Sequence, residues 1–131
     1  MNTNFQEQVN GLLVEQQGNL LVYTFDDITR DTLDVWTDHF TDYLVSLSGE
    51  PFQVLMDVSQ DTLSFTPYFR SSTQSVIDAY GHLPGRIAVL SHNRLITSVV
   101  DLYMRLQKQK RFQVAFFADR KAALKWLAEI N

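Results

Sequence analysis

The chain has 131 residues, no cysteine and a formal net charge of −4. This length suits one domain with its own hydrophobic core, which needs neither a disulfide nor a metal to fold. The acidic balance lacks the basic patch of a nucleic-acid-binding protein, so no nucleic-acid partner is expected. The absence of cysteine excludes thiolate metal sites and cysteine nucleophiles.

The N-terminal segment is polar and has no signal-peptide core, and no apolar run is long enough to span a membrane. We therefore expect one cytoplasmic domain over residues 1–131, with residues 1–10 loose. Two β-prone runs at residues 12–15 and 19–25 flank Gln-Gln-Gly-Asn, which predicts a hairpin. Apolar residues at helical spacing then predict a helix over residues 29–47, ended by Gly49 and Pro51.

Residues 53–58 form a short apolar run closed by Asp57 and Val58, which predicts a buried strand of a parallel sheet. A polar loop follows. Thr66 then suits the N-cap of a helix over residues 67–80, because Pro67 fits the first helical position. A strand, a loop and a capped helix in succession are the local unit of an α/β fold.

The same unit recurs twice more. Residues 86–90 and 112–118 predict strands, and residues 94–108 and 120–130 predict helices. The apolar face expected for the helix over 94–108 consists of Leu95, Val99, Leu102, Tyr103 and Leu106. The whole pattern predicts an α/β fold: a mixed, mainly parallel sheet of about five strands with four helices, the first strand being antiparallel at or near an edge.

Three stretches carry a family resemblance: Leu55-Met56-Asp57-Val58-Ser59, the strand over 86–90, and the closing segment 116–127. They resemble the STAS domain of anti-sigma-factor antagonists, and more closely the SpoIIAA-like (STAS/SEC14-related) families of small bacterial proteins. The resemblance covers residue 12 to the end. It implies a SpoIIAA/STAS-like fold and a role in regulation or signalling through a protein partner.

The resemblance also implies a modification site. Antagonists of the STAS type carry a phosphorylatable Ser or Thr where the helix after the central strand begins, and the matching residue here is Thr66. Its neighbours Phe65 and Pro67 replace the Asp and the small residue that are usual there. Because SEC14-related domains hold apolar ligands, a small apolar-ligand (lipid-like) binding domain is the alternative function.

No catalytic motif is present. The three histidines lack metal-binding spacing, no Ser lies in a G-x-S-x-G elbow, and no Walker or G-x-G-x-x-G loop occurs. We therefore expect no enzyme, no metal and no cofactor. An enzyme using Asp57 or His92 stays the third possibility, to be judged by whether the two converge on a cleft. The simpler interpretation of Asp57 is a carboxylate that orders its loop.

The loops at the carboxyl ends of the strands are the predicted working surface, because ligands of open α/β sheets bind there. Helix N-termini at Thr66, Asn93 and Asp119 would offer N–H donors to an anionic group or an acidic partner segment. Capping is the ordinary use of such residues. The predicted contact residues are Ser59, Asp61, Phe65, Thr66, Ser91 and His92. A homodimer through the aromatic helices at 29–47 and 67–80 is also expected.

Overall fold

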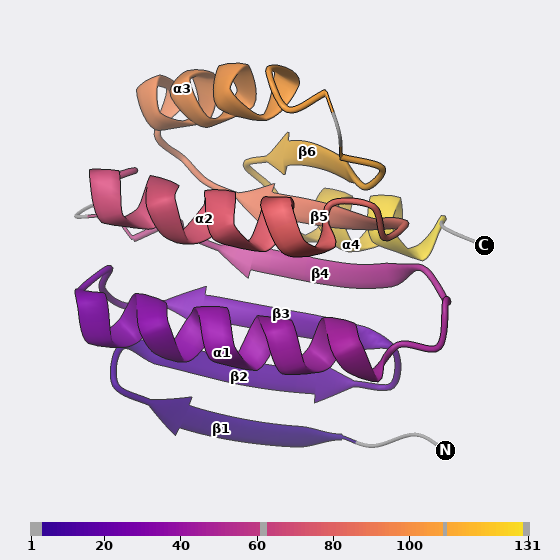
Figure 1. The fold of residues 1–131 in the computed structure, drawn as a ribbon. Coiled ribbons are helices and arrows are strands. Elements are labelled where there is room, and N and C mark those ends of the chain that lie inside the picture. Colours follow the sequence, from indigo (N-terminus) through magenta and orange to yellow (C-terminus); the bar gives the residue numbers. More distant parts are fainter. Residues whose placement is uncertain (1–3, 61–62, 109, 130–131) are drawn as a thin grey trace.

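The structure is a computed structural model that describes residues 4–60, 63–108 and 110–129. It contains one six-stranded sheet with helices on both faces (Figure 1). The strands are β1 (Phe5–Val9), β2 (Leu12–Gln17), β3 (Leu20–Phe25), β4 (Phe52–Asp57), β5 (Gly85–Leu90) and β6 (Gln113–Phe117). The helices are α1 (Arg30–Ser46), α2 (Pro67–Tyr80), α3 (Arg94–Arg105) and α4 (Arg120–Ala128).

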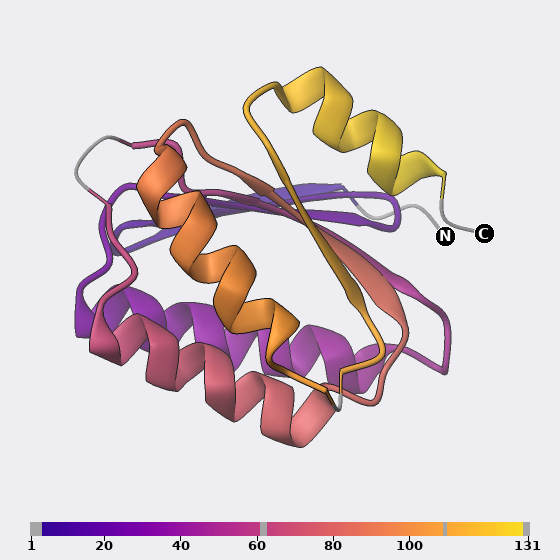
Figure 2. The same cartoon turned by 90° about the horizontal axis from the view of Figure 1, so that it is seen from above.

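The strands lie in the sheet in their order along the chain. Strands β1, β2 and β3 pair antiparallel, and β3, β4, β5 and β6 pair parallel. Each parallel connection moves one strand in the same direction, so right-handed crossovers place their helices on one face. Helices α1, α2 and α3 accordingly cover that face, and α4 packs on the other after the last strand (Figure 2).

The predicted α/β architecture and the interior position of β4 are confirmed, but the sheet has six strands where about five were expected. The additional strand is β1, in a segment predicted to be loose. Its side chains are mostly exposed, so its sequence has no apolar pattern. The strand is ordered by its pairing with β2, in which Phe5 lies opposite Gln16 and Val9 opposite Leu12. The turn between the two strands contains Asn10, which has φ 53°.

The element ends follow local signals. Thr29 and Thr66 cap α1 and α2, each accepting a hydrogen bond from a backbone N–H in the first turn. Helix α2 covers exactly the predicted residues, whereas α3 ends at Arg105, three residues earlier than expected. The hairpin between β2 and β3 turns at Gly18, which has φ 62°.

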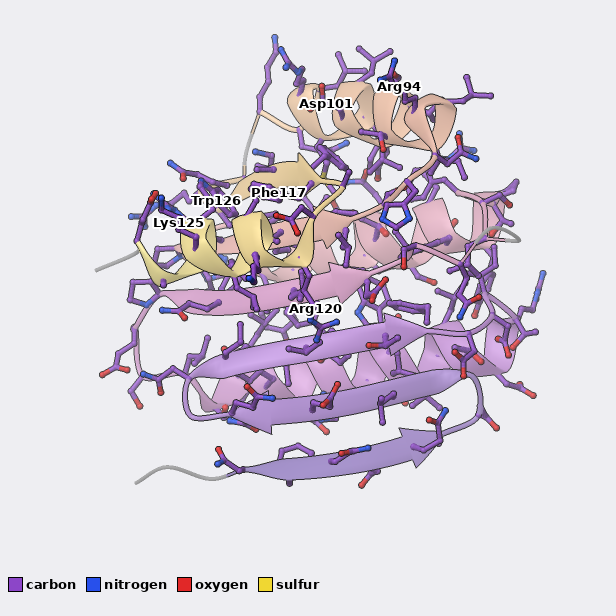
Figure 3. All side chains as sticks on the ribbon, turned by 180° about the vertical axis from the view of Figure 1, so that it is seen from behind. Arg94, Asp101, Phe117, Arg120, Lys125 and Trp126 are labelled. Atoms are coloured by element: carbon purple, nitrogen blue, oxygen red, sulfur yellow. The ribbon has the colours of Figure 1, made fainter. Side chains whose placement is uncertain are left out.

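The two faces of the sheet have separate cores. The face under α1, α2 and α3 holds the larger cluster, in which Trp36, Phe25, Phe40 and Phe69 contact one another edge to face or tilted. The opposite face holds a smaller cluster of β3, β4, β5 and α4. Helix α4 lies over β4, β5 and β6, and leaves that face of β1 and β2 uncovered (Figure 3).

Candidate functional site

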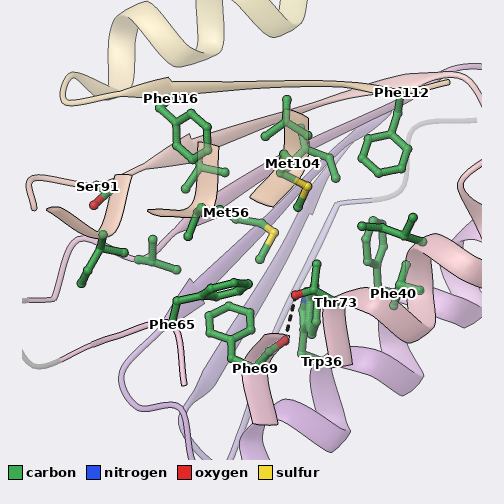
Figure 4. Close-up of a pocket in the computed structure, with 18 of the residues that line it drawn as sticks. Trp36, Phe40, Met56, Phe65, Phe69, Thr73, Ser91, Met104, Phe112 and Phe116 are labelled. Atoms are coloured by element: carbon green, nitrogen blue, oxygen red, sulfur yellow. Dashed lines mark hydrogen bonds between the residues drawn. The ribbon is translucent and has the colours of Figure 1, made fainter. Parts of the chain in front are cut away.

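An apolar cavity of about 70 Å³ lies between the sheet and helices α1, α2 and α3. Figure 4 shows its wall, with Trp36 and Phe40 from α1, Met56 from β4, and Phe69 from α2. The side chains of α1 and α2 reach the cavity because they recur every three or four residues on the helix face that packs on the sheet. The site is therefore a gap in the larger core.

Polar groups in this wall are few and mostly satisfied. The Thr73 hydroxyl donates to the Phe69 carbonyl (2.9 Å), so its hydrogen-bonding capacity is used within α2 (Figure 4). Ser91 is buried, and its Oγ accepts from the Asn93 N–H (3.3 Å). The exception is Trp36, which is 2% exposed and whose Nε1 has no hydrogen-bond partner among the described residues. An unpaired buried N–H is costly, and Trp36 Nε1 is the one buried side-chain polar atom without a partner among the described residues.

Helix α3 forms the roof of the cavity but buries none of its own residues. Ile96, Val100 and Met104 line the cavity and are half-buried. The apolar face predicted for this helix was wrong in direction, since four of its five members face solvent. Leu95, Val99, Leu102 and Leu106 are 75%, 49%, 60% and 65% exposed, respectively.

The reason for this error is that apolar side chains occupy most of the circumference of α3. Tyr103, the fifth member of the predicted face, is half-buried and packs on Phe65 at 5.5 Å between ring centroids. Periodicity identifies an apolar stripe, but it does not say which stripe touches the protein when a helix carries two.

The predicted contact residues lie in different surroundings in the structure. Phe65 and Ser91, both predicted as contact residues at the carboxyl ends of the strands, lie in the wall of the cavity. Phe65 packs on the rings of Phe69 and Tyr103 at 5.3 and 5.5 Å. Thr66 serves as the cap of α2, its Oγ1 accepting from the Phe69 N–H at 3.2 Å. Asp61 lies outside the described residues.

Asp57 orders its loop, as the simpler interpretation held. Its Oδ1 accepts from the N–H of Ser59 (3.0 Å) and from the Ser59 hydroxyl (2.6 Å). Its Oδ2 lies 3.6 Å from the Arg120 guanidinium. His92 is exposed and its Nε2 lies 3.0 Å from the Ala118 carbonyl, which can only accept, so this nitrogen carries the hydrogen. Asp57 and His92 thus have separate partners, and no hydrogen bond between them is found among the described residues.

A second hollow of about 430 Å³ lies at the far end of α1, between β1, β2 and that helix. Its wall is mixed, with the aromatic rings of Phe5 and Tyr43 beside the carboxylate-bearing residues Asp42 and Glu50. His39 also lines it, and its Nδ1 lies 2.8 Å from the hydroxyl of the buried Tyr23. Burial raises the pKa of this phenol, so it stays protonated. It donates to Nδ1 in the His39 tautomer that carries its hydrogen on Nε2, and accepts from Nδ1 in the other tautomer.

We predict that His39 makes stability depend on pH. Burial lowers the pKa of His39, so the unfolded imidazole protonates before the folded one as the pH falls. The stabilisation is complete above the unfolded pKa of about 6.5 and declines below it. We expect the free energy of unfolding, measured with urea, to fall less for His39→Gln than for the wild type between pH 8 and pH 5, about one and a half units either side of that value. If the free energies of unfolding of the wild type and His39→Gln fell equally over this pH range, this assignment would be contradicted.

Among the described residues, no three His, Asp or Glu side chains are grouped closely enough to hold a metal ion. No helix of the same residues combines the length and hydropathy needed to cross a membrane.

The layered sheet, the capped helices and the strand order together define a SpoIIAA-like α/β domain. A solved structure of similar fold is that of an uncharacterised protein of the DUF3478 family from Shewanella loihica PV-4, described as having a SpoIIAA-like fold. It aligns with a TM-score of 0.62 and 16% identity, over 95% of this chain and 92% of that one. This likeness establishes the fold alone. No protein-family model matches the chain, and no curated protein matches it significantly.

Proposed function

We propose that the protein is a non-enzymatic binding domain that holds a small apolar, lipid-like molecule between α3 and the sheet. The observation that carries this proposal is an apolar cavity under a helix that buries none of its residues. Ligand sites are mostly lined by apolar and aromatic side chains with a few polar groups. Met56, Phe65, Phe69 and Met104 supply such a lining here.

The size of the cavity supports a mechanism in which α3 moves. A cavity of about 70 Å³ is well below the several hundred Å³ that a ligand needs. Helix α3 is joined to α2 by hydrogen bonds from the Tyr103 hydroxyl to Gln74 Oε1 and from Gln74 Nε2 to Gln107 Oε1 (3.2 Å). Lifting the helix would break few contacts, and elements of low local stability commonly serve as lids.

The Trp36 indole supports a ligand that carries an oxygen. A buried donor without a partner gains a hydrogen bond when an acceptor arrives. An amphiphile with a carboxylate, ester or carbonyl oxygen, bound with its chain among the phenylalanines, would satisfy the donor and fill the cavity. A pure hydrocarbon would leave the indole unpaired.

The test uses laurate as the probe and Trp36 as the reporter. In a Trp126→Phe background, Trp36 is the only tryptophan, and laurate below its micelle concentration should shift its emission in a saturable way. Val100→Phe should weaken binding about tenfold or more, because the larger ring occupies the cavity. Val99→Phe is the matched control on the exposed side of α3 and should bind as the parent does. The proposal would be refuted if laurate left the Trp36 emission unchanged, or if Val100→Phe and Val99→Phe weakened laurate binding equally.

A protein partner at the carboxyl-end edge of the sheet is the second candidate function. Its support is that α2, α3 and α4 all begin there, with Ser64 and His92 exposed between them. Phosphorylation of Thr66 and a cytoplasmic location remain predictions that accompany this second candidate function. A pull-down from native lysate should lose a partner with Thr66→Glu and keep it with Thr66→Val, which removes only the cap. Identical partners for both variants would contradict this role.

A further inference from the structure

The outer side of α3 carries a continuous apolar stripe. Its members are Leu95, Val99, Leu102 and Leu106, whose spacing of four, three and four residues places them in one row along the helix. They make up four of the six large apolar side chains that are exposed among the described residues; the other two, Phe5 and Val45, lie on β1 and α1. Contiguous exposed apolar surface marks an interaction site.

Basic side chains border one flank of this stripe. Arg94 and Arg105 are exposed, and helical geometry places them on the same side of the row. Lys108, just after the end of α3, is a third exposed basic side chain. Figure 3 shows Arg94 projecting from α3 away from the sheet. The only acid of the helix, Asp101, is paired with Arg105 at 3.0 Å. The opposite flank, with Tyr103 and Gln107, is occupied by its contacts to α2.

The two halves of the sequence also differ in net charge. Residues 1–61 contain eleven acids and one base, a net charge of −10, whereas residues 62–131 contain four acids and ten bases, a net charge of +6. The acidic half contains β1 to β4 and α1, and α3 lies on the basic side of the molecule (Figure 1). An anionic surface would therefore attract α3 and repel the far end of the sheet.

We propose that α3 docks this protein on the surface of an anionic lipid bilayer. The leucine stripe enters the boundary between headgroups and acyl chains, and Arg94, Arg105 and Lys108 face the lipid phosphates. A second copy of the chain fits this surface less well, because a twofold contact through the stripe would bring the two basic flanks together. The docking surface is the outer side of α3 and does not depend on what occupies the cavity beneath it.

Co-sedimentation with vesicles tests the proposal. The full chain should sediment with vesicles of equal phosphatidylcholine and phosphatidylglycerol, and much less with phosphatidylcholine alone. Raising the salt from about 0.1 M to about 0.5 M should release it, because screening weakens attraction between exposed charges. Leu95→Gln with Leu102→Gln should reduce the bound fraction about tenfold or more, since both side chains leave the apolar phase. Arg94→Gln with Lys108→Gln should also reduce it.

Matched controls separate docking from general effects. Val45→Gln removes a similarly exposed apolar side chain from α1, and Lys121→Gln with Lys125→Gln removes two exposed charges from α4. Both variants should sediment like the wild type. The proposal fails if the wild type ignores anionic vesicles, or if the stripe variant binds them undiminished. It also fails if light scattering gives a dimer that Leu95→Gln with Leu102→Gln converts to a monomer, because the stripe then serves self-association.

Discussion

Replacing Trp36 with alanine is expected to lower the free energy of unfolding by about 3–5 kcal/mol, the range for removing a large aromatic side chain from a core. The indole is 2% exposed and contacts the rings of Phe25, Phe40 and Phe69, at centroid distances of 5.8–6.1 Å. It also lies beside the existing cavity. Its removal therefore enlarges a gap that is already present, and loses the contacts that join α1 to α2 across β3.

Two further variants show which part of the indole matters. Trp36→Phe keeps most of the apolar area and removes the unpaired Nε1–H, so its loss should be clearly smaller than that of the alanine variant. Trp126→Ala, in the smaller core on the other face, removes a half-buried ring that contacts Phe117 and should cost less than Trp36→Ala. Urea unfolding followed by far-ultraviolet circular dichroism measures all three. A Trp36→Ala midpoint equal to that of Trp126→Ala would contradict the assignment of Trp36 to the main core.

The local elements were predictable where a few neighbouring residues determine them. Thr66 and Pro67 supply a cap and a suitable first helical residue, and α2 begins where they predict. The strand β4 was equally clear, because it is buried on both faces and so reads as one apolar run. Strand β1 was missed for the opposite reason. Its order comes from pairing with β2, which its own exposed residues do not encode.

The candidate site was less predictable, because it depends on how elements distant in the sequence pack. Phe65 was singled out beside the cap of α2, but its place in the cavity wall depends on Tyr103, which lies on another helix. Trp36 belongs to the apolar residues at helical spacing over 29–47, but its unpaired N–H is visible only when every neighbour is placed. The leucines of α3 have the spacing of a core face, and only the position of the helix above α2 and the sheet shows them to be exposed.

Substituting Gly85 with alanine is expected to destabilise the fold by about 1–3 kcal/mol, the usual cost of overpacking a core. A Cβ at this position would lie 2.5 Å from the ring carbons Cγ and Cδ2 of Phe52, which is paired with Gly85 across β4 and β5. The ring is 1% exposed and is held between Phe40 and Phe112 at centroid distances of 6.1 and 5.7 Å. It cannot move aside without disturbing both neighbours or separating the strands.

A double-mutant cycle distinguishes this steric conflict from a general effect on β5. Phe52→Leu alone should be destabilising, because it removes apolar volume from the core. In the pair Gly85→Ala with Phe52→Leu, the smaller side chain makes room for the new methyl group, so the combined loss should be less than the sum of the single losses by about 0.5 kcal/mol or more. Gly49→Ala offers a contrast, since a Cβ there meets nothing within 4 Å but must adopt φ +82°. The free energy of unfolding lost through Gly49→Ala should be the same with and without Phe52→Leu. Additive losses in the Gly85 cycle, measured by urea unfolding, would show that the Phe52 ring is not what requires a glycine at this position.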